Sequence, residues 1–271
     1  MGRKNRYNDK NYCTNVGESL NDAVWSLETR TFQRDPLGNL TTIPFTGTGF
    51  LFKRKTLVST RYFLVSNRHV LAEGNPDCLL LKLPPKPISK TKAFPRVTYP
   101  LYPSKGKSLE EEPLSSVVHA HPTLDLAIID VTEKIRELKN EFAYRKFEIK
   151  SLEAKDLPIS WDIPTARPVH YLGFPDESIK PEIKKGHIKE NPKFTQNIGF
   201  DDMFVAQGAS GSPAFLNGEV GHYPKFLGVM ESTASSEPVE GFVQFVSGYA
   251  VKSTDLLDFI NDVLHNKGFH M

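Results

Sequence analysis

Short apolar runs rich in β-branched and aromatic residues recur along most of this 271-residue chain. They occupy residues 43–130 and return over residues 167–252, and Gly, Pro and Asn interrupt them repeatedly. Runs of this length and composition, separated by turn-forming residues, are typical of β-strands. Many short strands at this spacing predict an all-β sandwich or barrel, built here as two β units.

The segments between the strands give the expected domain organisation. We expect a helix near 132–144, a tight turn at Asn217–Gly218, and a C-terminal helix capped by Ser253 and running from about Thr254 to His265. A Pro-rich segment, residues 84–116, looks like an insertion in the first β unit, and its function stays open. The expected divisions are a polar N-terminal tail 1–16, a first β unit 17–131 with the insertion 84–116, a linker 132–160, a second β unit 161–252, and a helix and tail 253–271.

Charge and composition exclude several classes of protein. The chain has 34 Lys+Arg against 32 Asp+Glu without a broad basic stripe, so no nucleic-acid partner is expected. No apolar run approaches the roughly 20 residues that a bilayer requires, and no secretory signal is visible, so no membrane partner is expected either. Cys13 and Cys78 are expected to be reduced, which favours the cytoplasm or removal of a leader.

Three local patterns place His69, Asp125 and Ser210 in that order along the chain. A serine hydroxyl is a weak nucleophile at neutral pH. Acyl transfer therefore needs a histidine to accept its proton and a carboxylate to orient that histidine. Asp125 interrupts an apolar strand, where an ionised carboxylate is costly unless it is paired, and His69 is a suitable partner. A buried structural histidine is the alternative interpretation.

The segment Gly208–Pro213 surrounds Ser210 with small residues. A tight turn around a nucleophile lets backbone N–H groups point at a developing oxyanion, and glycine permits such a turn. Gly208, Ala209 and Ser210 are therefore the candidate oxyanion donors. A Gly/Ser-rich turn between two strands is also common in proteins without catalytic function.

Several segments resemble the landmark segments of chymotrypsin-like serine proteases. They are Thr46–Leu51, Leu64–Val70, Asp125–Ile128, Gly208–Pro213, Tyr171–Pro175, Leu227–Val229 and Ser247–Val251. The resemblance covers about residues 43–262 and is greatest to the bacterial trypsin-like branch that includes the Deg, or high-temperature-requirement, proteases. It implies two six-stranded antiparallel β-barrels with a C-terminal helix, and a site in the cleft between the barrels.

The resemblance also implies roles for individual residues. Ser210 would be the nucleophile, His69 the general base and then acid, and Asp125 the orienting carboxylate of a serine endopeptidase that forms an acyl-enzyme. Substrate would lie along Glu231, Ser232 and Thr233, with a side-chain pocket near Phe204 and Gln207. An apolar pocket is favoured over one that Asp201 or Asp202 makes acidic. The implied partner is a protein or peptide substrate, and no cofactor is implied.

Two residues depart from the family pattern. Ala209 stands where secreted digestive members have an aspartate that receives a new N-terminus, so activity would be constitutive or controlled by loop ordering or a regulatory protein partner. Ser212 stands where a glycine is frequent. We also expect no carboxyl-terminal PDZ domain like those of many Deg proteases, and the oligomeric state stays open.

Three alternatives compete with the protease hypothesis. The same fold could serve as a noncatalytic peptide-binding module, or the same triad could act as an esterase. His119 and His121 have a spacing that can ligate zinc, but no third ligand is evident nearby, so no metal site is expected.

Overall fold

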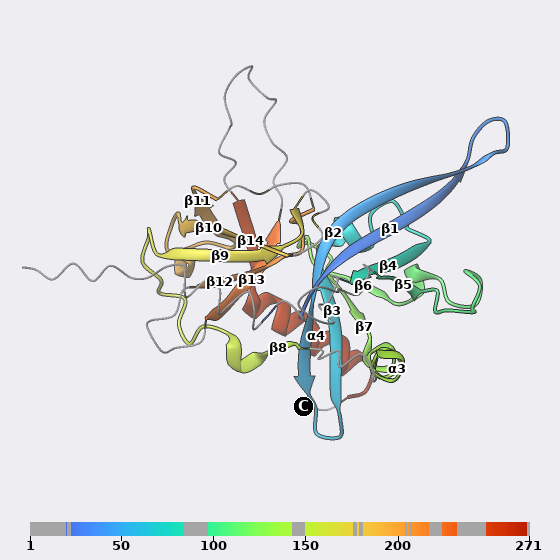
Figure 1. The fold of residues 1–271 in the computed structure, drawn as a ribbon. Coiled ribbons are helices and arrows are strands. Elements are labelled where there is room, and N and C mark those ends of the chain that lie inside the picture. Colours follow the sequence, from blue (N-terminus) through green and yellow to red (C-terminus); the bar gives the residue numbers. More distant parts are fainter. Residues whose placement is uncertain are drawn as a thin grey trace, which may run out of the picture.

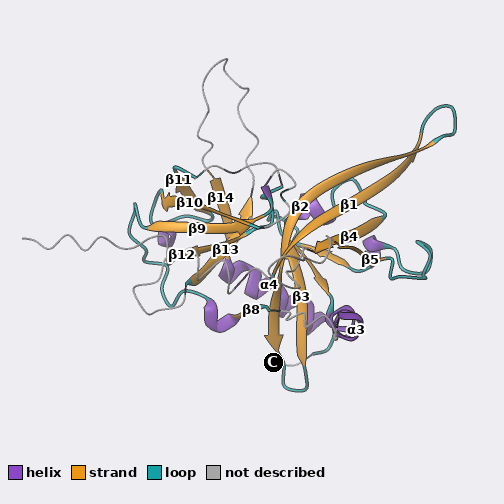
Figure 2. Cartoon of the chain, viewed as in Figure 1, coloured by secondary structure: helices purple, strands orange, loops and turns teal. Residues whose placement is uncertain are grey.

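Two β units lie side by side in the computed structural model, and a long C-terminal helix runs beneath them (Figures 1 and 2). The structure describes residues 20, 23–83, 97–142, 150–175, 178, 181–203, 205, 208–216, 224–231 and 248–269. Among these residues, no helix is long and apolar enough to cross a membrane. The two-unit β architecture and the C-terminal helix confirm the expected fold class.

The first unit is an eight-stranded sheet that includes a long β1–β2 hairpin projecting away from the rest of the molecule (Figure 1). Seven antiparallel strands follow the order β5-β4-β1-β2-β3-β7-β6, and β8 pairs with β2 in parallel. Its elements are β1 (Val24–Arg34), β2 (Leu40–Lys55), β3 (Thr60–Ser66), α2 (Arg68–Leu71), β4 (Cys78–Leu83), β5 (Val97–Tyr102), η1 (Leu114–Ser116), β6 (Val118–Ala120), β7 (Ala127–Asp130), α3 (Thr132–Phe142), β8 (Leu152–Glu153) and η3 (Ala154–Asp156).

This sheet has eight strands where six were expected, and three of the eight come from segments in which the sequence analysis placed no strand. The insertion contributes β5, and the linker contributes β8. The sequence analysis also placed no strand before residue 43 and so missed β1. Polar residues interrupt the apolar pattern of β1, but Glu28 is buried against Lys82 and Arg30, which neutralise it within the sheet.

The second unit is a closed six-stranded antiparallel barrel, as expected. The strands follow the order β10-β11-β14-β13-β12-β9 around the barrel. Aromatic and aliphatic side chains such as Tyr171, Phe200 and Leu227 fill its interior and are fully buried. Its elements are β9 (Pro168–Gly173), β10 (Glu182–Ile188), η5 (Pro192–Phe194), β11 (Ile198–Asp201), β12 (Pro213–Leu216), β13 (Lys225–Glu231), β14 (Gly248–Lys252) and the helix α4 (Ser253–Asn266) that follows the barrel.

One apolar cluster joins the two units. The Phe50 ring on β2 meets the Phe226 ring on β13 edge-on, with centroids 5.3 Å apart. Leu256 and Ile260 on α4 belong to the same cluster, and all four side chains are fully buried. Burying a side chain of this size stabilises the fold by about 1.5–3 kcal/mol. The cluster therefore fixes β2 against the barrel of the second unit.

The helices follow the sequence prediction with one correction. The helix expected near residue 132 is α3, and the expected C-terminal helix is α4. Ser253 does not cap α4, because Lys252 occupies the cap position and the buried Ser253 hydroxyl has no hydrogen-bond partner among the described residues. The Asn217–Gly218 turn lies outside the described residues.

Candidate active site

His69 and Asp125 lie together at the edge of the first unit. His69 belongs to the short helix α2, which follows strand β3, and Asp125 lies in the loop between β6 and β7. One carboxylate oxygen of Asp125 lies 2.6 Å from His69 Nδ1, and the other accepts the His69 backbone N–H at 3.0 Å. Because the carboxylate accepts both groups, it fixes the position of the backbone and the rotation of the imidazole ring.

Two further contacts fix the backbone around Asp125. The side-chain amide of Asn67 donates a hydrogen bond to the Asp125 carbonyl at 2.7 Å. The N–H of Leu126 donates to the Leu124 carbonyl at 2.8 Å, which places Asp125 at the centre of a three-residue turn. The segment that carries His69 therefore holds Asp125 through both its side chain and its backbone.

The electrostatics of the pair follow from partial burial and opposite charge. Burial lowers the pKa of His69, but the hydrogen bond and charge of Asp125, helped by Glu73 and Glu231, raise it above 6.5 overall. Burial raises the pKa of Asp125, and the contacts with His69 outweigh this effect and lower it below 3.8. Burial and the charge of Asp125 raise the pKa of Glu231. Asp125 is thus ionised at neutral pH and favours a basic His69.

Ser210 lies in a tight turn ahead of strand β12. The N–H of Ser212 donates to the Ala209 carbonyl at 3.0 Å, which closes a four-residue turn around Ser210. Gly208 and Gly211 have φ angles of 85° and 86°, a region that glycine occupies without strain. A Cβ atom on Gly211 would also lie only 2.0 Å from the Thr48 carbonyl oxygen. The turn therefore requires glycine at Gly211.

Thr48 on strand β2 ties this turn to the first unit. Its backbone N–H donates to the Ser210 carbonyl at 2.8 Å, and its hydroxyl donates to the Gly208 carbonyl at 2.8 Å. The same hydroxyl accepts the Phe174 N–H from the end of β9 at 2.9 Å. Thr48 is fully buried, so these hydrogen bonds are shielded from water.

The segments carrying His69 and Ser210 meet at Gly47. A Cβ atom on Gly47 would lie 2.7 Å from the side chain of Val70, the neighbour of His69, and 3.4 Å from the Ser210 carbonyl oxygen. The absence of a side chain at Gly47 lets α2 and the Ser210 turn approach the same point on β2. The three segments that the sequence analysis singled out thus lie at one junction between the two units.

Comparison with known proteins gives a structural likeness without a sequence match. No protein-family model and no curated protein matches the sequence. Solved structures of the HtrA-type protease AlgW with a tripeptide and with a decapeptide superimpose with TM-scores of 0.55 and 0.57, and Deg5 with a TM-score of 0.53. This chain has the HtrA protease fold.

These likenesses hold at 16% sequence identity for each of the three structures. The matches cover 93% or 94% of this chain, while it spans 63% and 67% of the two AlgW chains and 93% of Deg5. At this identity the comparison shows the fold alone, which is the chymotrypsin-like fold that the sequence motifs implied.

The structure describes only some of the residues that were expected to bind substrate. Glu231 ends strand β13, beside the Ser210 turn, where the Gly211 N–H donates to the Met230 carbonyl at 3.0 Å. Asp201 and Asp202 are exposed, and Asp202 lies 3.8 Å from His187 on the surface. Phe204, Gln207, Ser232 and Thr233 lie outside the described residues.

Sequence reasoning missed three residues that organise this site. It quoted Thr48, Ser66 and Asn67 within motifs but gave them no role, although all three are fully buried. Ser66 donates its hydroxyl to the Thr48 carbonyl at 2.7 Å. The available signal was a pair of small polar residues, Ser66 and Asn67, at the end of an apolar strand, because such groups need hydrogen-bond partners when they are buried.

The zinc alternative finds no support in the described part of the chain, which contains no group of three His, Cys, Asp or Glu residues placed to hold a metal ion. His121 instead uses Nδ1 to accept the N–H groups of Thr123 and Leu124. Cys78 is a buried free thiol, and Cys13 lies outside the described residues.

Proposed function

We propose that this protein is a serine endopeptidase that uses Ser210, His69 and Asp125. The observation that carries the proposal is the double contact between Asp125 and His69, at 2.6 Å and 3.0 Å. A carboxylate that accepts from Nδ1 fixes the neutral ring with its proton on Nδ1 and leaves Nε2 as a base. The proximity of both α2 and the Ser210 turn to Gly47 supports Ser210 as the group that this base serves.

The proposed reaction begins with attack on a peptide carbonyl. His69 Nε2 takes the proton of the Ser210 hydroxyl as its oxygen bonds to the carbonyl carbon. His69 then gives that proton to the leaving nitrogen, the C–N bond breaks, and an acyl-enzyme remains. Water, deprotonated by the same imidazole, releases the acid product and restores Ser210. Asp125 stabilises the imidazolium that forms in each half of the reaction.

We assign the oxyanion site to the backbone of Gly208, Ala209 and Ser210. The carbonyl groups of these residues accept hydrogen bonds from Thr48 and Ser212. In a planar trans peptide the C=O and N–H groups point in opposite directions. The hydrogen bonds to the Gly208 and Ala209 carbonyls therefore orient the N–H groups of Ala209 and Ser210 away from Thr48 and Ser212. Removing one such donor typically costs about 10²–10³ in turnover.

Substrate is proposed to bind as an extended peptide along Glu231, Ser232 and Thr233. Glu231 is the last residue of β13, and an added strand would continue the antiparallel pairing there. Phe204 and Gln207 are assigned to the side-chain pocket, with an apolar preference. Two of the similar solved structures are of the HtrA-type protease AlgW with a tripeptide and with a decapeptide, which supports a peptide substrate.

A fluorophosphonate probe followed by peptide cleavage tests the proposal. The wild-type protein should be labelled at Ser210 and should cleave a peptide library, whereas Ser210→Ala should do neither while remaining folded. His69→Ala should lose as much activity as the double variant, because the two residues act as one unit. Absent labelling would favour the noncatalytic module, and labelling with ester but no peptide turnover would favour an esterase.

A further inference from the structure

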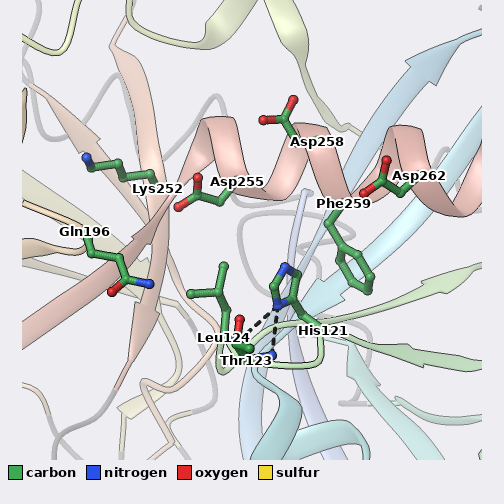
Figure 3. A pocket seen from close by; sticks show the side chains of 9 residues that line it. All are labelled: His121, Thr123, Leu124, Gln196, Lys252, Asp255, Asp258, Phe259 and Asp262. Carbon is green, nitrogen blue, oxygen red and sulfur yellow. Dashed lines mark hydrogen bonds between the residues drawn. The ribbon is translucent and has the colours of Figure 1, made fainter.

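His121 begins the loop that ends at Asp125, and its side chain folds back onto that loop (Figure 3). Its Nδ1 atom accepts the backbone N–H of Thr123 at 3.2 Å and that of Leu124 at 3.0 Å. The backbone N–H of His121 donates to the Leu126 carbonyl at 2.8 Å. The residue therefore closes the loop from both sides of Asp125.

These contacts determine the protonation state of the ring. An imidazole nitrogen accepts a hydrogen bond only through its lone pair, so Nδ1 must be unprotonated. The neutral ring then has its proton on Nε2. A second proton on Nδ1 would point at the N–H groups of Thr123 and Leu124 and would remove both hydrogen bonds.

Helix α4 and the segment before His69 hold the ring and the loop in place. The Phe259 ring on α4 meets the His121 ring edge-on, with centroids 5.0 Å apart. The guanidinium of Arg68 lies 3.5 Å and 3.4 Å from the carbonyls of His121 and Pro122. The loop thus contacts α4 through Phe259 and contacts Arg68, the residue before His69.

The charges around His121 come from three elements. His121 lines a cavity of about 380 Å³ together with Asp255, Asp258 and Asp262 of α4 and with Lys252 at the end of β14 (Figure 3). Burial lowers the pKa of His121 and Arg68 lowers it further, while Asp255 and Asp262 oppose this shift without reversing it. The environment therefore favours the neutral ring that the backbone hydrogen bonds require.

We propose that neutral His121 is a positioning residue, which holds the 121–125 loop so that Asp125 can orient His69, and that protonation of His121 releases the loop. The proposal rests on the function proposed above. It predicts a second acid-side titration in addition to that of His69. Activity would fall once as His69 gains a proton and again, at lower pH, as His121 does.

Two substitutions of His121 separate the role of its Nδ1 hydrogen-bond acceptor from the role of its aromatic ring. His121→Phe keeps an aromatic ring beside Phe259 but removes the acceptor, and kcat should fall about 10- to 100-fold with KM little changed, as expected for displaced catalytic groups. In His121→Asn the amide oxygen can accept the same N–H groups without titrating. This variant should recover most of the activity that His121→Phe loses.

The pH profile gives the decisive kinetic result. In the wild type, the slope of log(kcat/KM) against pH should be one where only His69 titrates and should exceed one across the lower pH range in which His121 also gains a proton. His121→Asn should show a slope of one throughout, and the exposed-site control His265→Asn should keep the steeper region of the wild type. A wild-type slope that never exceeds one, or wild-type kcat in a folded His121→Phe, would overturn the proposal.

A spectroscopic measurement tests the same residue without requiring protease activity. Nitrogen–proton correlation spectra of the full-length protein should show the neutral Nε2–H form of His121 at neutral pH. The low-field Nδ1 proton of His69, bonded to Asp125, should persist in His121→Asn and broaden on protonation of wild-type His121. The other neutral tautomer at His121 would overturn the positioning role, whereas absent peptide turnover with these signals intact would count against the protease function alone.

Discussion

Thr48 donates its backbone N–H to the carbonyl of Ser210 at 2.8 Å, across the junction of the two β units. The two residues are 162 positions apart in the sequence. The Thr48 hydroxyl adds a second hydrogen bond to the same turn, at Gly208, and accepts one from Phe174. A buried residue of the first unit thus determines the position of the proposed nucleophile in the second.

Replacing Thr48 by Val tests this connection. The change keeps the side-chain shape but leaves the buried Gly208 carbonyl and Phe174 N–H without their partner, and each unsatisfied group costs about 1–3 kcal/mol. We expect the free energy of unfolding in denaturant to fall by roughly 2–6 kcal/mol. Thr48→Ser keeps the hydroxyl and should lose less than Thr48→Val. Equal stability of the two variants would show that the hydroxyl contacts contribute little.

Asp125→Asn should separate geometry from charge at the proposed triad. The carboxylate accepts two N–H groups from His69, and an asparagine amide offers only one accepting atom, so the ring is driven to the other tautomer. Turnover should fall by roughly 10⁴-fold, as in the type case of such a substitution, while the circular dichroism spectrum stays unchanged. Asp162→Asn, at an exposed position outside the site and outside the His121 cavity, is the matched control and should leave turnover within about twofold. Substantial activity in Asp125→Asn would contradict the orienting role.

Glu231→Gln should move the acid limb of the activity profile. The Glu231 carboxylate contributes to the raised pKa of His69, so a neutral amide at this position lowers that pKa. Only neutral His69 accepts the serine proton, so activity should rise at a lower pH than in the wild type. The midpoint of kcat/KM against pH measures this shift. A midpoint that stays fixed or moves to higher pH would exclude electrostatic coupling of this sign.

Gly211→Ala should destabilise the Ser210 turn. The φ angle of 86° strains any residue with a Cβ atom, and the new methyl group would lie 2.0 Å from the Thr48 carbonyl oxygen. Strain and overpacking together should cost about 2–5 kcal/mol in chemical denaturation. Gly74→Ala provides the control, because Gly74 has a similar φ of 73° but open space around its Cβ position. The difference between the two variants isolates the steric contact.

Local sequence patterns predicted the elements whose character is set within a few residues. The apolar runs around Leu64 and Ile128 became β3 and β7, and the helical spacing after residue 253 became α4. Strand β1 was missed because its buried Glu28 looks like a surface residue until Lys82 is placed beside it. The cap at Ser253 was wrong because burial of the hydroxyl excluded the expected local hydrogen bond.

The sequence by itself determined the two-unit β fold, and it singled out His69, Asp125 and Ser210 by residue type and local context. Only the tertiary structure decided which groups hold them: Asn67 on the Asp125 carbonyl, Thr48 on the Ser210 turn and His121 within the Asp125 loop. The physical reason is that strand and helix periodicity arises from neighbouring residues. Hydrogen-bond partners for buried polar groups depend instead on which distant segments the packed core brings together.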